Sequence, residues 1–142
     1  MGRKLIILFV ISIFCLGMKS NEFKFEIEIS GMAQVKGNLM IAIFKDAATF
    51  PEEKSAVHKL VFPVTKKSVV LDLSKYVKLN EKFAIALFHD ENGNKKLDKN
   101  LFGVPTERYG FSNNARGTFG PPSFSESAIN LKGSERHQIT LK

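Results

Sequence analysis

Two short, uninterrupted apolar runs constrain the fold of this chain more than any other feature. They are residues 38–44, Asn-Leu-Met-Ile-Ala-Ile-Phe, and residues 83–88, Phe-Ala-Ile-Ala-Leu-Phe. Both runs are too short for ordinary helices and are rich in β-branched and aromatic residues, so they are expected to be central strands buried on both faces. Ala84 and Ala86 share one face of the second run, where a neighbouring layer can approach closely.

Further short strands are expected on either side of these runs. Apolar and charged residues alternate over residues 23–29, which is the pattern of a strand with one buried face. The other expected strands are residues 56–64, 68–73, 128–131 and 137–141. Six to seven strands at short spacing, without an amphipathic helix, predict an all-β protein with a single antiparallel β-sandwich, immunoglobulin-like or prealbumin-like.

Residues 99–127 do not follow this strand pattern. The segment is rich in glycine and proline, and a loop of this length inside a compact domain is usually functional or disordered. Its aromatic residues carry too much apolar surface to be left in water. These residues are Phe102, Tyr109, Phe111, Phe119 and Phe124. We therefore expect one long ordered loop that folds back over one end of the sandwich.

Residues 1–20 have the layout of a secretory signal peptide. Basic Arg3 and Lys4 precede an apolar run over residues 5–16, and small or polar residues follow. The run is shorter than the roughly 20 residues that span a bilayer, so no membrane span is expected after cleavage. A retained membrane anchor is the alternative. Residues 21–142 are then expected to form one exported domain, periplasmic or secreted.

Charge and cysteine content exclude other classes of protein. The formal net charge of +7 includes Arg3, Lys4 and Lys19 of the predicted signal peptide. The remaining positive charge is mild and evenly scattered, which argues against nucleic-acid binding. The one cysteine, Cys15, lies in the same segment, so disulfides are not expected to stabilise the domain. We expect a monomer.

Residues 89–98 carry the most specific chemistry in the sequence. Oxygen-bearing side chains recur there with the spacing of positions 1, 3, 5 and 9 of a calcium loop. The backbone carbonyl of Lys96 and a carboxylate from the following loop are candidates to complete the site. The candidate Ca²⁺ ligands are Asp90, Asn92, Asn94, Lys96, Asp98 and Glu107.

This acidic loop departs from an EF-hand in two places. Lys95 stands where that loop has its turn glycine, and Leu101 stands where it has the bidentate glutamate. The loop is more similar to the strand-flanked Asp-x-Asn-x-Asn-x-x-x-Asp loops of β-sandwich modules in bacterial surface proteins. Residues 90–99 have no net formal charge, which favours a structural site of the weak class, roughly 10⁻⁴–10⁻³ M. The alternative is a polar hairpin turn without metal, because Asn92-Gly93 is a strong turn signal.

A second candidate site lies in residues 107–116. Aromatic faces beside amide and guanidinium groups suit a sugar or an anionic small molecule. The candidate ligand-binding residues are Arg108, Tyr109, Asn113, Asn114 and Arg116. The alternative is that the aromatic rings pack against the sandwich while the polar groups satisfy the loop's own backbone.

No catalytic constellation is recognised in the sequence. His58, His89 and His137 are isolated from one another, with no pair at metal-ligand spacing. Ser112 lacks the glycine two residues later that a nucleophile elbow requires. The sequence therefore favours a protein that is not an enzyme.

Three motifs occur in order along the chain: residues 89–98, residues 102–114 and residues 119–124. Together they resemble the domain-of-unknown-function 2141 (DUF2141) family of exported bacterial proteins, and Lys95, where glycine is frequent in that family, is the main departure. The resemblance implies a secreted or periplasmic β-domain and no particular activity. The leading hypothesis is a non-enzymatic β-sandwich whose calcium loop fixes a surface that meets an unidentified partner in the cell envelope. The alternative is a small-ligand or carbohydrate-binding protein, with a hydrolase as a further option, that uses residues 107–116.

Overall fold

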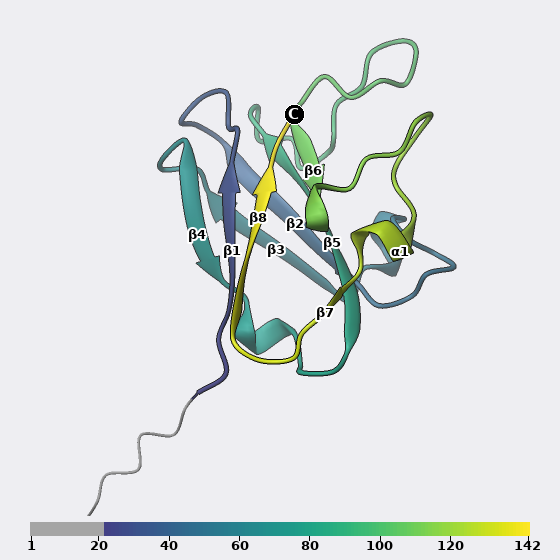
Figure 1. Cartoon of the computed structure of the whole chain (residues 1–142). Coiled ribbons are helices and arrows are strands. Elements are labelled where there is room, and N and C mark those ends of the chain that lie inside the picture. The colour runs from purple at the N-terminus through teal and green to yellow at the C-terminus, as the bar shows by residue number, and fades with distance from the viewer. Residues whose placement is uncertain (1–21) are drawn as a thin grey trace, which may run out of the picture.

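The computed structural model of the protein describes residues 22–142, and the predicted signal peptide lies outside the described residues. Within them, eight strands form two facing sheets, with one short α-helix (Figure 1). The all-β, sandwich-like fold predicted from the sequence is confirmed, with eight strands where six to seven were expected. No helix within residues 22–142 is long and apolar enough to cross a membrane.

The smaller sheet has the strand order β4-β1-β8. Its central strand, β1 (Phe25–Ser30), pairs antiparallel with β4 (Ser68–Asp72) and parallel with β8 (Glu135–Thr140). The parallel pair differs from the antiparallel sandwich that we predicted. Alternation of apolar and polar residues predicts which face of a strand is buried, but it does not predict the direction of the neighbouring strand.

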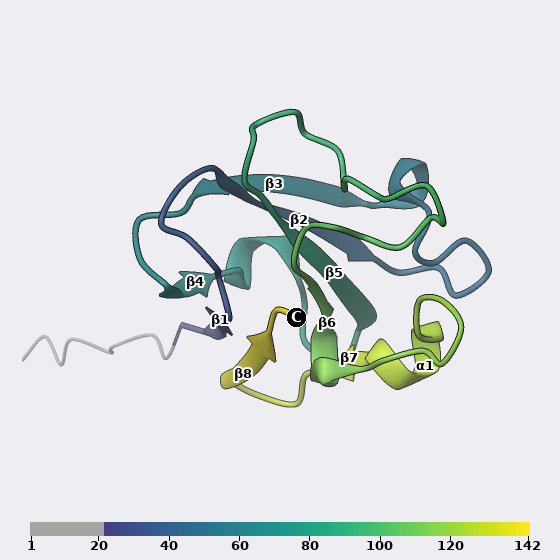
Figure 2. The same ribbon diagram turned by 90° about the horizontal axis from the view of Figure 1, so that it is seen from above.

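The larger sheet has the strand order β3-β2-β5-β6, and the two apolar runs form its centre as β2 (Asn38–Phe44) and β5 (Lys82–Asp90). The strand β3 (His58–Pro63) lies at one edge. On the other side, β6 (Tyr109–Phe111) and β7 (Ile129–Asn130) pair with different parts of β5. The strands of this sheet run obliquely to those of the smaller sheet (Figures 1 and 2).

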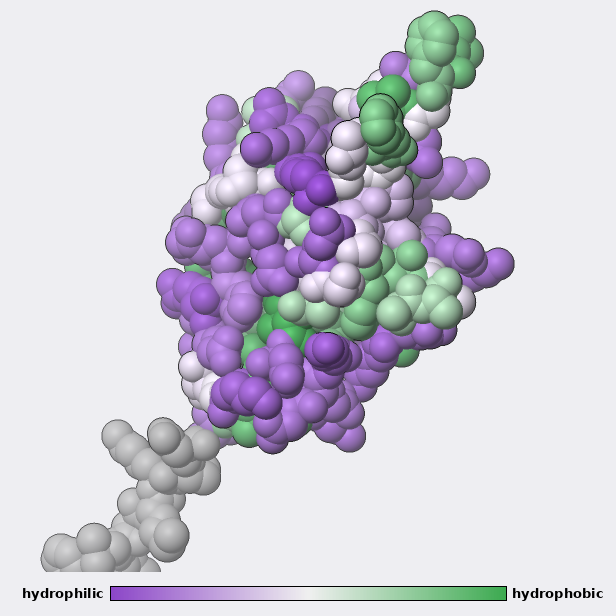
Figure 3. Space-filling model, turned by 45° about the vertical axis from the view of Figure 1, so that its right-hand side comes forward, coloured by the Kyte–Doolittle hydropathy of each residue, from purple (hydrophilic) through white to green (hydrophobic). Residues whose placement is uncertain are grey.

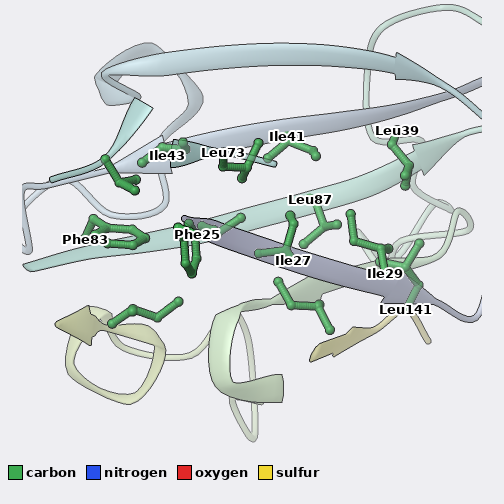
Figure 4. Packing of buried hydrophobic residues seen from close by; sticks show 14 of the residues in the cluster. Phe25, Ile27, Ile29, Leu39, Ile41, Ile43, Leu73, Phe83, Leu87 and Leu141 are labelled. Carbon is green, nitrogen blue, oxygen red and sulfur yellow. The ribbon is translucent and has the colours of Figure 1, made fainter. Parts of the chain in front are cut away.

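The core lies between the two sheets. Every second residue of β1, β2 and β5 points inward, and Figure 4 shows side chains from these strands meeting in the space between the sheets. The rings of Phe25 and Phe83 pack edge to face, with their centroids 5.5 Å apart. The outward side chains of β1 are polar, whereas those of β2 and β5 include Met40, Ala42 and Phe88. The larger sheet is therefore apolar on both faces, which explains its uninterrupted apolar runs.

The segment 99–127 is ordered, as predicted, and lies beside β5 and over the face of the larger sheet that points away from the core, instead of over one end of the sandwich (Figure 2). It contains the one α-helix of the described residues, α1 (Phe124–Ser127). A capping box begins this helix: the Ser123 side chain accepts from the Glu126 N–H, and the Glu126 carboxylate accepts from the Ser123 N–H. Hydrogen bonds from Ser123 lower the pKa of Glu126. Short 3₁₀ helices in the connections are η1 (Glu53–Ser55), η2 (Ser74–Tyr76) and η3 (Ser112–Asn114).

Candidate functional site

The acidic loop begins at Asp90, the last residue of β5. Asp90 is fully buried, and its carboxylate accepts backbone N–H bonds from Gly93 at 2.8 Å, Asn94 at 3.1 Å and Lys95 at 3.0 Å. Lys95 has a φ of 63°, the left-handed conformation that favours glycine. The turn is therefore organised around one buried carboxylate, and the lysine occupies its left-handed position.

The next predicted calcium ligands gather at Asp98. The Asp98 carboxylate accepts from Nδ2 of Asn92 at 2.6 Å and from Nδ2 of Asn94 at 2.9 and 3.0 Å. The side-chain oxygens of the two asparagines accept backbone N–H bonds, Asn92 from Asn94 at 3.0 Å and Asn94 from Lys96 at 2.8 Å. The ligand positions predicted from the spacing thus lie together, and the loop's own donors bind their oxygens.

Glu107 lies in the segment that returns to the sheet, and its side chain binds the backbone at both ends of the acidic loop. Its Oε1 accepts from the Glu91 N–H at 3.0 Å, and its Oε2 accepts from the Asp98 N–H at 3.1 Å. The carboxylate that the sequence singled out as the missing ligand therefore does lie against the loop. Within residues 22–142, no three His, Cys, Asp or Glu side chains converge as a metal-binding group.

Four of the residues predicted to bind a ligand in segment 107–116 instead have side chains that bind backbone groups. Arg108 donates to the Gly31 carbonyl at 3.0 Å, and Arg116 donates to carbonyls in β6 and β8. Asn113 donates to two carbonyls in and just after α1, and Asn114 bonds to the β8 backbone. These bonds hold β6 and η3 against the rest of the domain. They correspond to the alternative in which the polar groups satisfy the backbone.

An apolar groove with a volume of about 720 Å³ lies on the outer face of the larger sheet. Its floor consists of residues of β2, β5 and β6 that point away from the core. They include Met40, Ala42, Phe44, Ala86, Phe88, Tyr109 and Phe111. Ala42 and Ala86 are direct cross-strand neighbours. Because both side chains are small, the floor has a hollow there between bulkier residues.

Two loops flank the groove. The segment that follows the acidic loop contributes Leu97 and Phe102, and residues 117–121 contribute Phe119. Phe102 and Phe119 are 90% and 102% exposed. Figure 3 shows apolar surface at loops on this side of the molecule, surrounded by hydrophilic residues. Large apolar groups gathered on a surface in this way are typical of binding sites.

An aromatic cluster bounds one end of the groove. The Phe50 ring packs edge-on against Phe44, Phe111 and Phe124, with centroid distances of 5.2, 5.9 and 5.7 Å. Because Phe44 and Phe111 also belong to the floor of the groove, this packing holds the floor in place at that end.

The side chains of His89 and Ser112 are buried and bound to backbone groups. His89 is fully buried, and its Nε2 lies 2.7 Å from the Lys36 carbonyl oxygen, so Nε2 is the donor. The Ser112 hydroxyl accepts from the Ile85 N–H at 2.9 Å and donates to the Ser127 carbonyl. Both side chains connect segments of the chain that are distant in sequence.

The groove did not emerge from the sequence, although one signal for it was present. The outer faces of residues 40–44 and 83–88 carry only apolar side chains, a pattern that predicts burial under a neighbouring layer. In the structure, the outer face is only partly covered, by the loops beside Phe102 and Phe119.

A comparison with known families places most of the chain in one family. A family model described as "Uncharacterized protein conserved in bacteria (DUF2141)" matches residues 27–139. No curated protein and no solved structure gives a significant match. The matched residues run from β1 into β8 and include the acidic loop and all residues that line the groove. Because the match covers most of the chain, the protein belongs to the DUF2141 family, as its three motifs indicated.

Proposed function

We propose that this protein is an exported, non-enzymatic binding module whose ligand lies in the apolar groove of the larger sheet. The observation that carries the proposal is the groove itself, which has a volume of about 720 Å³ and is lined mainly by apolar and aromatic side chains. Small-ligand sites typically enclose about 300–1,000 Å³ and are lined in this way. A solvent-facing side of an antiparallel sheet is ordinarily polar, so Met40, Ala42 and Phe88 on this face favour a binding role over a structural one.

The proposed export rests on residues 1–20, whose basic start and short apolar run have the layout of a signal peptide. Amino-terminal sequencing of the protein from its native host tests this part, because an intact amino terminus would contradict cleavage. An exported chain that keeps no cysteine depends for stability on its core and its loops.

In this proposal, calcium bound in the acidic loop stabilises the wall of the groove that contains Leu97. Ca²⁺ takes six to eight oxygen ligands, and Asp90, Asp98 and the two asparagine amides place oxygens on one short loop. Each oxygen that accepts one N–H bond keeps a further lone pair for a metal. The ion would neutralise Asp98, which now accepts from amide donors.

Filling the hollow in the groove floor is expected to abolish binding of an apolar probe. Ala86→Phe adds a ring directly opposite Ala42. The neutral fluorescent dye N-phenylnaphthylamine should bind the wild-type protein saturably. The variant should lose at least about tenfold in affinity, or about 1.4 kcal/mol, because the ring occupies the space that the dye needs. Fluorescence titration measures both affinities.

A matched control adds the same ring elsewhere. Val70 is exposed on β4 of the smaller sheet, so Val70→Phe should leave dye binding unchanged. Circular dichroism verifies that each variant is folded, and Ala42→Leu replaces Ala86→Phe if that protein does not fold. A folded groove-filling variant that binds the dye as well as wild type would contradict the proposal.

Calcium is expected to raise the melting temperature. With a dissociation constant near 0.1 mM, about 10 mM Ca²⁺ adds roughly 2.7 kcal/mol to the free energy of unfolding. For a domain of this size, that corresponds to an increase of about 3–6 °C. Thermal melting in chelator, calcium and magnesium measures the effect, and Asp98→Asn should lose it. No increase with calcium, or an equal increase with magnesium, would exclude a calcium-selective site.

A further inference from the structure

We infer that the ligand of the groove is an amphipathic anion, such as a medium-chain carboxylate, with its charged end beside Lys95 and Lys99. The inference rests on the proposed function, because it gives the chemical class of ligand for that same groove.

The charges that line the groove are unbalanced. They come from Glu53, Lys59, Lys95 and Lys99. Lys59 Nζ lies 3.0 Å from Glu53 Oε1, so these two charges compensate each other. Among residues 22–142, Lys95 and Lys99 take part in none of the ion pairs. The lining therefore includes two lysines that form no ion pair within the described residues, and such groups favour an anionic ligand.

The carboxylates nearest to these lysines in sequence already have partners. Asp90 accepts three backbone N–H bonds, and Asp98 accepts from the side-chain amides of Asn92 and Asn94. Glu91 faces Lys36, with Oε2 and Nζ 3.6 Å apart. Neither Lys95 nor Lys99 forms an ion pair with these carboxylates, so their ammonium groups can approach a ligand.

The charged and the apolar lining residues come from different elements: the lysines from the loop after β5, and the floor from the strands. The two lysines belong to the loop that follows β5, and this loop leaves the sheet at the end where Asn38 pairs with Asp90. The apolar floor extends away from that end along β2, from Met40 to Phe44, a distance of roughly 13 Å at 3.3 Å per residue. The aromatic cluster around Phe50 lies at the far end.

This separation fits a molecule with one anionic end and an apolar body. A sugar requires several polar groups placed along its length, whereas the arginine and asparagine side chains of segment 108–116 are bound to the backbone. The exposed rings of Phe102 and Phe119 stand at the rim, where an aliphatic body would cover them. Their covering would remove from water the largest exposed apolar groups beside the groove.

The test compares three competitors with one chain length and different end groups. Decanoate, decanol and decylamine displace N-phenylnaphthylamine from the wild-type protein at low ionic strength. We expect decanoate to bind about tenfold more tightly than decanol, since only the carboxylate can form exposed ion pairs with the two lysines. Decylamine should bind most weakly. Added salt should reduce the difference in affinity between decanoate and decanol, because salt screens exposed charges.

Charge-removing variants locate the anionic end. The double variant Lys95→Gln, Lys99→Gln should bind decanoate about tenfold more weakly and decanol unchanged. Lys66→Gln, Lys67→Gln makes the same charge change in the exposed turn between β3 and β4, and should alter neither affinity. An equal loss in both double variants would overturn the placement of the anion beside Lys95 and Lys99.

The remaining outcomes separate this inference from the proposal beneath it. Equal affinity for decanoate and decanol would overturn the anion assignment and leave an apolar site. Failure of the dye to bind at all would remove the proposed function, and the inference with it. Binding to phosphatidylglycerol vesicles that depends on Phe102 and Phe119, without displacement of the dye by decanoate, would overturn the inference in favour of a membrane surface.

Discussion

Gly37→Ala is expected to lower the free energy of unfolding by about 2–5 kcal/mol, because it adds both a steric overlap and an unfavourable backbone conformation. Gly37 has a φ of 65° and lies directly behind the start of the acidic loop. A methyl group there would overlap the Asp90 carbonyl oxygen and lie 2.9 Å from the Glu91 Cα. Both neighbours are backbone atoms, so the clash cannot be relieved by rotation of a side chain.

Gly103→Ala is the matched control for this prediction. Gly103 has a φ of 78°, but no atom lies within 4 Å of the added methyl group. Gly103→Ala should therefore lower the free energy of unfolding only by the cost of placing an alanine in the left-handed conformation, about 1–2 kcal/mol. Urea unfolding at a common slope measures both variants. If Gly37→Ala were no more destabilising than Gly103→Ala, the close approach of residue 37 to the acidic loop would be refuted.

Asp90→Ala is expected to destabilise the domain by about 3–5 kcal/mol even when calcium is absent. The substitution removes the buried acceptor of three backbone N–H groups, those of Gly93, Asn94 and Lys95. A hydrogen bond to a charged group contributes about 1.5–3 kcal/mol, and water replaces part of the loss at an exposed loop. Urea unfolding in the presence of a chelator measures this cost without any contribution from metal.

Asp98→Ala provides the comparison for Asp90. The Asp98 carboxylate accepts from two asparagine side chains that are exposed, so water can replace it. We expect a cost below about 1 kcal/mol in chelator. A small cost for both substitutions would show that Asp90 does not organise the turn. Because Asp90→Ala is expected to destabilise the domain itself, the loss of calcium binding is better tested at Asp98.

The positions of the strands that carry the site could be predicted from the sequence. Their pairing within the sheets could be predicted only in part. The run over residues 38–44 has the same bounds as β2, and residues 83–88 lie inside β5, because a short apolar run rich in β-branched and aromatic residues favours a buried strand over a helix. The strand β6 was missed: three residues with Gly110 at the centre carry no periodicity. The parallel pairing of β1 with β8 depends on contacts between residues 110 positions apart, which no local pattern encodes.

The acidic loop and the groove differ in the same way. Spacing alone placed Asp90, Asn92, Asn94 and Asp98 together, because the pattern is local. The orientation of the asparagine amides, with nitrogen toward Asp98, depends on the three-dimensional course of the loop. The groove depends on how the loops near Phe102 and Phe119 fold across a sheet built from residues up to 81 positions away. Such long-range closure cannot be deduced from composition or periodicity.

The parallel pairing of β1 and β8 also has a mechanical consequence. Six residue pairs connect the two strands, from Phe25 with Glu135 to Ser30 with Thr140. A force that pulls residue 25 and residue 140 apart acts along both strands, whereas the hydrogen bonds of the ladder run between them. The ladder is then loaded in shear, so its bonds share the tension and must yield together instead of unzipping one by one. The sandwich is therefore expected to resist mechanical unfolding by a force applied to its two ends.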